Sequence, residues 1–232
     1  MPFFYMDYWY LVLVVPTIII ALFAQFRVNS AFRKYSAHQS RIGFSAAEVT
    51  RRILDSNGLY NVKVERVSGR LTDHYDPKAN VIRLSESVYD SSSIAAIGVA
   101  AHEAGHAVQY AEKYLPIKLR NSIIPIASLG TNLAPFIIIF GLLLSFEPLI
   151  WTGIILYSAI ALFQLVTLPV EFNASGRAIN TLSSMAILQP DEISGARRVL
   201  SAAALTYVAA LLTTLANLLR FILLASRGNR RR

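Results

Sequence analysis

The sequence predicts a mainly α-helical membrane protein with a small β-sheet, and three observations support this fold class. The chain of 232 residues is 54% hydrophobic and only 16% charged, whereas soluble domains typically contain about a quarter charged residues. Several long uncharged runs have about the length that a helix needs to cross a bilayer. The polar block after the first run contains short Val-rich segments bounded by turn residues, as strands usually are.

The first apolar run predicts an N-terminal transmembrane anchor within residues 1–26. Trp9 and Tyr10 begin the run like an interfacial aromatic belt, and Arg27 follows its end. A cleaved signal peptide is the alternative, but signal peptides begin with a basic segment, and residues 1–7 contain no Lys or Arg. We therefore expect a retained anchor with its basic end in the cytoplasm.

Residues 27–121 are polar and are expected to form a cytoplasmic α+β segment. Ser45 and Glu48 stand in a capping-box pattern. This pattern predicts a helix that runs to about Ser56 and stops at residues 57–58, an Asn-Gly pair.

Two short strands are predicted later in the same block. Val62, Val64 and Val67 indicate the first, and residues 80–84 indicate the second. Gly and Pro punctuate the stretch between them. We expect a strand–turn–strand element, either a small β-hairpin or a small sheet, directly before the next helix.

Residues 122–169 are expected to form a transmembrane hairpin. Residues 122–146 and 149–169 carry no charge, and Glu147-Pro148 between them suggests a tight turn. A hairpin returns the chain to the side that it left. The segment after Pro169 is therefore expected to face the same compartment as the polar block.

The last segment, residues 170–232, is expected to hold a polar helix, a further membrane helix and a basic tail. Pro190 and the acids after it look like a helix start, and residues 201–219 are apolar enough to span. If this helix crosses, the tail lies outside the cytoplasm, against the positive-inside tendency. If it only lies on the membrane, the tail stays inside. The fourteen Lys and Arg within residues 27–120 favour a cytoplasmic position for the polar block.

The helix after the strands carries a His-Glu-x-x-His spacing. His102 and His106 lie four residues apart, so they share one helix face and can bind one metal ion. Glu103 is placed to act as general base on a metal-bound water, whose pKa a zinc ion lowers towards neutrality. Residues 91–93, three serines, supply N-cap oxygens. The pattern predicts an HExxH zinc-helix metallopeptidase fold with about four transmembrane helices and one catalytic Zn2+.

An accidental match is the alternative, because this five-residue pattern recurs by chance. Two of the four histidines of the chain fall within it, however. Both lie in an apolar segment, where an unpaired His or Glu is costly to bury. These observations favour a metal site.

The absence of cysteine and the distribution of charge limit which metal ligands and which binding partners the chain can have. The chain contains no Cys, which excludes disulfides and a thiolate zinc site. The net charge of +8 is spread along the extramembrane segments. That distribution indicates membrane topology and contact with anionic lipids rather than nucleic-acid binding.

A catalytic zinc needs three protein ligands and one open position, so a third ligand is required. Glu112 stands six residues after His106, where some zinc peptidases have a third His, but it points about 240° around the helix. Glu171 is an acid that a neighbouring membrane helix can bring to the site. An interfacial Glu that marks the end of a span is the alternative for Glu171, and His38 and His74 stay open as ligands.

Three stretches together resemble a known family. Residues 73–77 (DHYDP), 100–107 (AAHEAGHA) and 168–175 (LPVEFNAS) look like signatures of the YugP-type neutral zinc metallopeptidases of bacterial membranes. The likeness covers nearly the whole chain. It implies a gluzincin-like site with His102, His106 and Glu171 as zinc ligands and Glu103 as base. It also implies relatives among membrane peptidases of the HtpX and CAAX-processing kind.

The residue that stabilises the oxyanion of the tetrahedral intermediate is left open. His74, Tyr75, Tyr110 and Arg177 are rival donors, because such sites need a donor besides the metal. Asp76-Pro77 can equally well only shape a turn that exposes His74.

The strand around residues 81–84 is a candidate for binding the substrate backbone by strand addition. The alternative is a small sheet that only covers the zinc helix.

These observations predict a multi-pass membrane zinc endopeptidase, with its catalytic side in the cytoplasm of a bacterial cell. Its partners are expected to be membrane or juxtamembrane protein substrates and the lipid bilayer, with an oligomer or a membrane-protein partner left open. Two alternatives remain. One is an intramembrane-type zinc protease. The other is a non-catalytic membrane protein with a structural zinc, which needs a fourth ligand from His38, His74 or Glu112.

Overall fold

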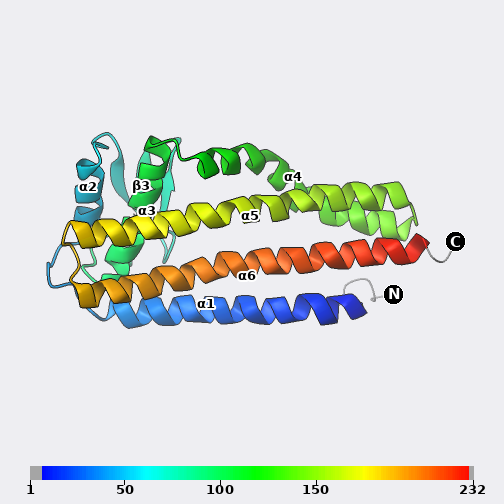
Figure 1. Ribbon diagram of the computed structural model, residues 1–232, viewed down its shortest axis with the longest axis horizontal. Helices are drawn as coiled ribbons and strands as arrows, with labels where there is room; N and C mark the ends of the chain where they lie inside the picture. The colour runs from blue at the N-terminus through cyan, green and yellow to red at the C-terminus, as the bar shows by residue number, and fades with distance from the viewer. Residues whose placement is uncertain (1–6, 230–232) are drawn as a thin grey trace. The chain divides into compact units, whose positions relative to one another are not determined.

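The computed structural model describes residues 7–229 and is mainly helical, as the sequence predicts (Figure 1). A π-helical turn, η1 (Tyr10–Val14), leads into α1 (Val15–Ser36). The elements that follow are α2 (Ala46–Ser56), β1 (Lys63–Val67), β2 (His74–Asp76), β3 (Val81–Ser85), α3 (Ile94–Ala111), α4 (Leu115–Leu143), α5 (Glu147–Ser184) and α6 (Pro190–Asn229).

The chain divides into two compact units. Unit 1 comprises Met1–Ala24, Lys118–Leu168 and Thr206–Arg232, and unit 2 comprises Gln25–Ile117 and Pro169–Leu205. Helices run through the segment boundaries expected at residues 26, 121 and 169. The predicted boundaries lie where the sequence changes between apolar and polar. A helix does not end at such a change, because its backbone hydrogen bonds continue until a capping residue ends it.

Among the described residues, four helices are long and apolar enough to cross a membrane, as predicted. Their apolar windows are only 11 to 28% buried within the protein. Large apolar side chains such as Leu22 (66% exposed) and Ile155 (69%) face outward. Outward-facing apolar side chains suit a hydrocarbon solvent, and closed helical hydrogen bonding satisfies the backbone there.

The turn between the second and third of these helices differs in position from the prediction. The link comprises residues 144–146, with Ser145 at a φ of 50°. Glu147 and Pro148 instead form the first turn of α5. Proline is tolerated there, because a first-turn N–H has no partner within the helix.

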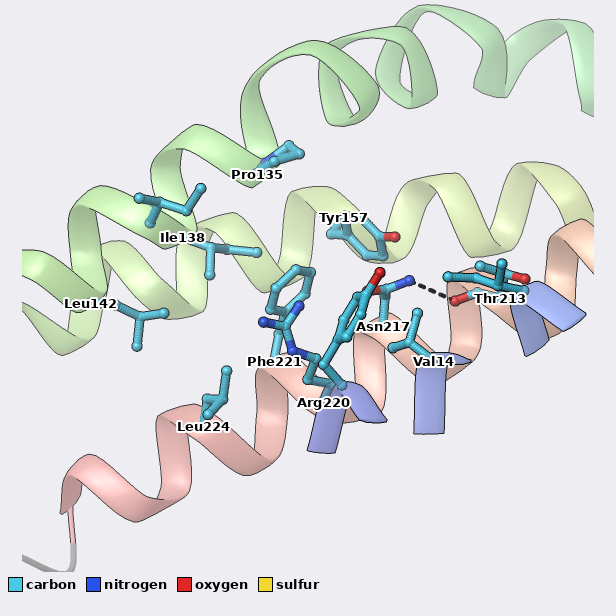
Figure 2. A pocket seen from close by; sticks show the side chains of 13 residues that line it. Val14, Pro135, Ile138, Leu142, Tyr157, Thr213, Asn217, Arg220, Phe221 and Leu224 are labelled. Atoms are coloured by element: carbon cyan, nitrogen blue, oxygen red, sulfur yellow. Dashed lines mark hydrogen bonds between the residues drawn. The ribbon is translucent and has the colours of Figure 1, made fainter. Parts of the chain in front are cut away.

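Unit 1 encloses a cavity of about 380 Å3 lined mostly by apolar side chains (Figure 2). Tyr157, Asn217 and Arg220 add polar atoms to its wall. Arg220 forms an ion pair with Asp7, with 2.6 Å between Nη2 and Oδ2. The pairing offsets the cost of burying a guanidinium among apolar helices.

The sheet in unit 2 differs from the expected strand–turn–strand element, because it has three strands rather than two. Its order is β1-β3-β2, with β1 parallel and β2 antiparallel to β3. The two predicted strands are therefore parallel partners, and a third strand at His74–Asp76 forms the hairpin with β3. The segment proposed for strand addition, residues 81–84, lies on the central strand, whose two edges are both paired. Only β1 and β2 present a free edge among the described strands.

Local signals place the helices of unit 2 as predicted. The capping box of α2 is complete, since Ser45 Oγ accepts from the N–H of Glu48 and Glu48 Oε2 accepts from the N–H of Ser45. Ser93 caps α3 by accepting from the N–H of Ala96. Helix α6 begins at Pro190. The end of the basic tail, residues 230–232, lies outside the described residues.

Candidate metal centre

Helix α3 forms the floor of the candidate site and is packed unusually closely. It is rich in small residues, and most of its side chains are buried in the core of unit 2. A Cβ atom added at Gly105 would lie 2.9 Å from the carbonyl oxygen of Ala174 on α5. Glycine between the two histidines therefore lets the backbone of α5 approach α3.

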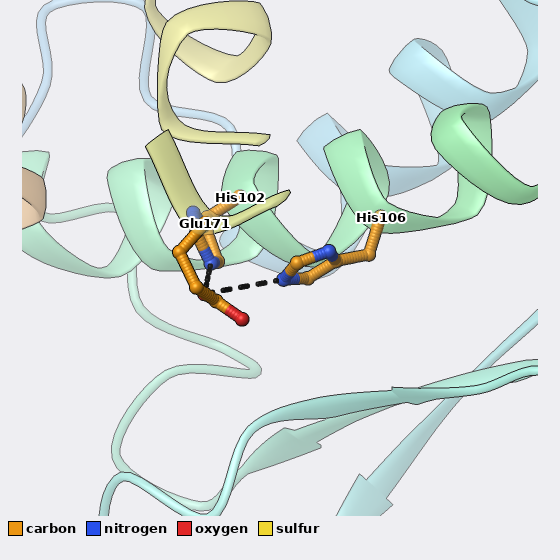
Figure 3. A group of neighbouring side chains, drawn as sticks. All are labelled: His102, His106 and Glu171. Atoms are coloured by element: carbon orange, nitrogen blue, oxygen red, sulfur yellow. Dashed lines mark ion pairs between the residues drawn. The ribbon is translucent and has the colours of Figure 1, made fainter. Parts of the chain in front are cut away.

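That approach brings Glu171 of α5 to the two histidines of α3, and the three side chains point toward one another (Figure 3). Glu171 Oε2 lies 3.3 Å from Nε2 of His102 and 3.6 Å from Nε2 of His106. The three ligand atoms lie within 4.8 Å of one another. The structure thus places together the two histidines and the glutamate that the sequence proposes as ligands.

Two hydrogen bonds orient the imidazole rings. Nδ1 of His102 lies 3.1 Å from Oγ of Ser175, and Nδ1 of His106 lies 2.9 Å from Oε1 of Gln109. Each ring therefore uses Nδ1 for a protein partner and turns Nε2 toward Glu171. Partners of this kind fix the tautomer and the direction of a ligating histidine.

Gln109 fixes the His106 tautomer through its own contacts. It is fully buried, and its Nε2 donates to the carbonyl oxygen of Val170 and to Oδ1 of Asn173, both at 2.9 Å. Because the amide nitrogen faces two acceptors, Oε1 is the atom left for His106. Nδ1 of His106 then carries the proton, and its Nε2 keeps a free lone pair.

The donor set fits a divalent cation. Oε2 of Glu171 is buried and accepts no hydrogen bond from the residues that the structure describes. It faces Nε2 of His106, whose lone pair is free, and Nε2 of His102, so three potential ligand atoms converge on one point. A set of two His and one carboxylate is typical of catalytic zinc.

The electrostatics around His106 favour positive charge. Burial alone lowers the pKa of His106, but the adjacent Glu171 carboxylate and the negative charge of Glu103 outweigh it, so the net pKa is raised. The same field attracts a metal cation to the imidazoles, and binding then displaces the protons.

Glu103 is held by strand β2. Its side chain is nearly buried, and Oε2 accepts the backbone N–H of Tyr75 at 3.0 Å. Asp73, just before β2, accepts from the N–H and Oγ of Ser85. Burial raises the pKa of Asp73 more than the bonds from Ser85 lower it, and the nearby Glu103 adds to the rise. The predicted base is thus tied to the stretch that carries the DHYDP residues.

Comparison with known proteins agrees with this geometry. A family model described as "Putative neutral zinc metallopeptidase" matches residues 10–226. The chain belongs to this family. It is also 51% identical over 209 residues to the "Putative membrane protease YugP" of Bacillus subtilis (strain 168), covering 90% of this chain and 93% of that protein. No solved structure matches the chain.

Membership of the family implies Zn2+ as the cofactor, in agreement with the prediction, and His102, His106 and Glu171 can hold it. The group of neighbouring donors found among residues 7–229 does not include the candidate fourth ligands His38, His74 and Glu112. Glu112 pairs with Arg177 instead, at 2.7 Å.

The four rival oxyanion donors lie in different surroundings. His74 is exposed on β2, with Nδ1 2.8 Å from the carbonyl oxygen of Thr72. The hydroxyl of Tyr75 donates to Asn80, and its ring packs edge-on against Tyr110. Arg177 donates to Asn173 besides pairing with Glu112. No contact singles out one of them, so the identity of the donor stays a prediction.

Sequence reasoning missed Gln109, Asn173 and Ser175 as parts of the site. Two of them lie one helical turn from a proposed ligand: Gln109 is three residues after His106, and Ser175 is four after Glu171. That spacing was the available signal, because residues three or four apart share a helix face.

Proposed function

We propose that this chain is a membrane-embedded zinc-dependent endopeptidase in which His102, His106 and Glu171 hold the metal and Glu103 is the general base. The observation that carries the proposal is the convergence of the three ligand atoms within 4.8 Å, with Glu103 beside the first ligand. Membership of a zinc metallopeptidase family supports it.

The chemistry divides between the cofactor and the chain. Zinc, when bound, acidifies water and polarises the carbonyl of the scissile peptide bond. Glu103 takes a proton from the attacking water and passes it to the leaving amine nitrogen. The N–H of Tyr75 holds one carboxylate oxygen of Glu103, which leaves the other for proton transfer. Ser175 and Gln109 keep both imidazoles turned toward the metal.

Strand β2 is the best candidate to align the substrate backbone. It is an edge strand, and its Tyr75 contacts the proposed base directly. A substrate segment added to this free edge would be held by main-chain hydrogen bonds, largely independently of its side chains.

Substrates are proposed to be membrane proteins or their juxtamembrane segments. Residues 7–229 include four apolar helices able to span a bilayer, and the relative in Bacillus subtilis is named "Putative membrane protease YugP". A peptidase confined to a membrane meets such segments at high local concentration. We propose a cytoplasmic catalytic side, since the polar block carries most of the basic residues.

The test is the Glu103→Gln variant of the full chain. It is expected to retain about the wild-type zinc content, because Glu103 is not a ligand, and to lose peptidase activity by several orders of magnitude. Membrane fractions of cells carrying each form would then be compared by quantitative proteomics. Substrates should accumulate uncleaved with the variant. Normal cleavage by Glu103→Gln would remove the mechanism.

A further inference from the structure

A concave basic surface in unit 2 is lined by residues from the second half of α1 and the first part of α6. Its volume is about 360 Å3. Four cations line it: Arg27 and Lys34 from α1, and Arg197 and Arg198 from α6. We call this feature the basic pocket. Its residues are separate from the metal ligands and from Glu103.

The charged residues that line the basic pocket are all positive. None of the lining residues is acidic. No Asp or Glu stands three or four residues before or after any of the four cations, where a helical neighbour would pair with it. Four exposed cations on one hollow surface attract anions strongly.

The wall of the pocket combines polar and apolar residues. Ser30 and Ser201 contribute hydroxyl groups beside the cations. Phe26, which is 63% exposed, and Ala202 contribute apolar surface. A small inorganic anion would use only the polar part of such a wall, whereas an amphipathic anion would use both.

The position of the cations along the chain points to the membrane surface. Arg27 directly follows the uncharged run of residues 8–26, and Arg197 and Arg198 directly precede the apolar residues 201–219. Cations at the ends of apolar stretches are typical of the headgroup level of a bilayer. Basic pockets between membrane helices are known to bind lipid headgroups.

The two walls are held in place by contacts next to the pocket. A Cβ at Gly195 of α6 would lie 2.7 Å from the ring of Tyr35, which lines the pocket from α1. Arg41, which follows α1, forms two hydrogen bonds to Asp191 of α6, at 2.6 and 3.1 Å. Glu192 also accepts the N–H of Arg41 at 2.9 Å. A preformed pocket loses less entropy when a ligand binds.

We propose that the basic pocket binds the phosphate-bearing headgroup of an anionic phospholipid, such as phosphatidylglycerol. The guanidinium groups of Arg197 and Arg198 match phosphate oxygens in a bidentate manner. The serine hydroxyls donate to the remaining oxygens, and the apolar lining residues contact the first part of an acyl chain.

The test titrates a soluble short-chain phosphatidylglycerol into the delipidated full chain in a neutral detergent, with calorimetry as the readout. The double variant Arg197→Gln/Arg198→Gln is compared with the control Lys63→Gln/Lys78→Gln. Both pairs are exposed in unit 2, and both double variants lower the net charge from +8 by two. Each basic residue near an anionic surface contributes about 1 kcal/mol, so the pocket variant should bind roughly 20- to 30-fold more weakly. The control should bind like wild type.

A second variant separates the shape of the pocket from its charge. Ser201→Trp keeps every cation and fills the cavity from an exposed position. It should also weaken binding at least about tenfold, whereas a purely electrostatic attraction would leave it unchanged. Thermal unfolding of each variant checks that the protein is folded.

Two ligand controls complete the test. Short-chain phosphatidylcholine should not bind measurably, and millimolar inorganic phosphate should not displace phosphatidylglycerol. Equal losses in the two double variants, wild-type binding by Ser201→Trp, or displacement by inorganic phosphate would each overturn the proposal.

Discussion

At the scale of single residues, the proposed site depends on groups that touch no substrate. Gln109 connects the two ligand-bearing helices, because its amide contacts His106 on α3 and both Val170 and Asn173 on α5. Asn173 in turn accepts from Arg177. These contacts give a buried amide a fixed orientation, and with it a fixed tautomer of His106.

Gln109→Met is expected to weaken zinc binding roughly 10- to 100-fold, as loss of a histidine's hydrogen-bond partner does at other metal sites. Methionine has nearly the same side-chain volume as glutamine, so the loss of zinc affinity reflects the missing hydrogen bonds more than a change in packing. Competition with a chromophoric chelator measures the affinity, and the visible spectrum of the cobalt-substituted protein measures the ligand geometry.

Two controls accompany Gln109→Met. Thr50→Val removes another buried hydrogen-bonding group, from α2, and should leave zinc affinity unchanged. Asn173→Asp keeps the acceptor for Gln109 and Arg177 and should retain most of the affinity. If Gln109→Met bound zinc as tightly as wild type, the orienting role of Gln109 would be wrong.

At the scale of elements, the approach of α5 to α3 sets the position of Glu171. Gly105→Ala places a methyl group against the carbonyl oxygen of Ala174 and should cost about 1–3 kcal/mol of stability through overpacking. Zinc affinity should fall as well, because the helices must move apart.

Gly176→Ala on α5 is the matched control for this change. Nothing lies within 4 Å of a Cβ at Gly176, and the residue is exposed. Replacing an exposed helical glycine should stabilise by about 0.5–1 kcal/mol. Thermal unfolding in micelles measures the stability of both variants. An equal change in melting temperature for Gly105→Ala and Gly176→Ala would contradict close packing at Gly105.

The capping box of α2 gives a prediction for acid stability. Its bonds with Ser45 hold the pKa of Glu48 below its usual value of 4.5. A carboxyl group whose pKa is lowered by folding stabilises the protein above its unfolded pKa, and this contribution is lost as the pH falls through the folded value. The melting temperature of Glu48→Gln should therefore fall less than that of wild type on acidification from about pH 5. Glu86→Gln removes the same charge from another exposed position, and its melting temperature should fall with pH as steeply as that of wild type.

Elements with local signals were predictable, and those that depend on distant partners were not. Ser45, Glu48 and Asn57 specify the ends of α2 within a few residues, so that helix was predicted correctly. The partner of β1 is β3, a parallel neighbour in the sheet although β2 comes between them in the sequence. Residues 63–67 contain nothing that encodes this direction. Gln109 was missed for a similar reason, because its three partners come together only when α5 packs on α3.

At the scale of the whole molecule, the distribution of apolar residues establishes a membrane protein, and the orientation in the membrane is a proposal. The chain has no cysteine, so single introduced cysteines report position without background labelling. If the catalytic side is cytoplasmic, an impermeant maleimide should label Leu144→Cys in intact cells. Lys78→Cys should react only after permeabilisation. The reverse pattern would place the catalytic side outside.

Glu171 lies far in sequence from His102 and His106, so a bound zinc ion would also link α3 to α5. The zinc content of purified Glu171→Leu, compared with wild type and with Glu112→Leu, tests this ligand set most directly. Elemental analysis should find about one zinc ion per chain in wild type and in Glu112→Leu, and almost none in Glu171→Leu. Full zinc occupancy in Glu171→Leu would contradict the site.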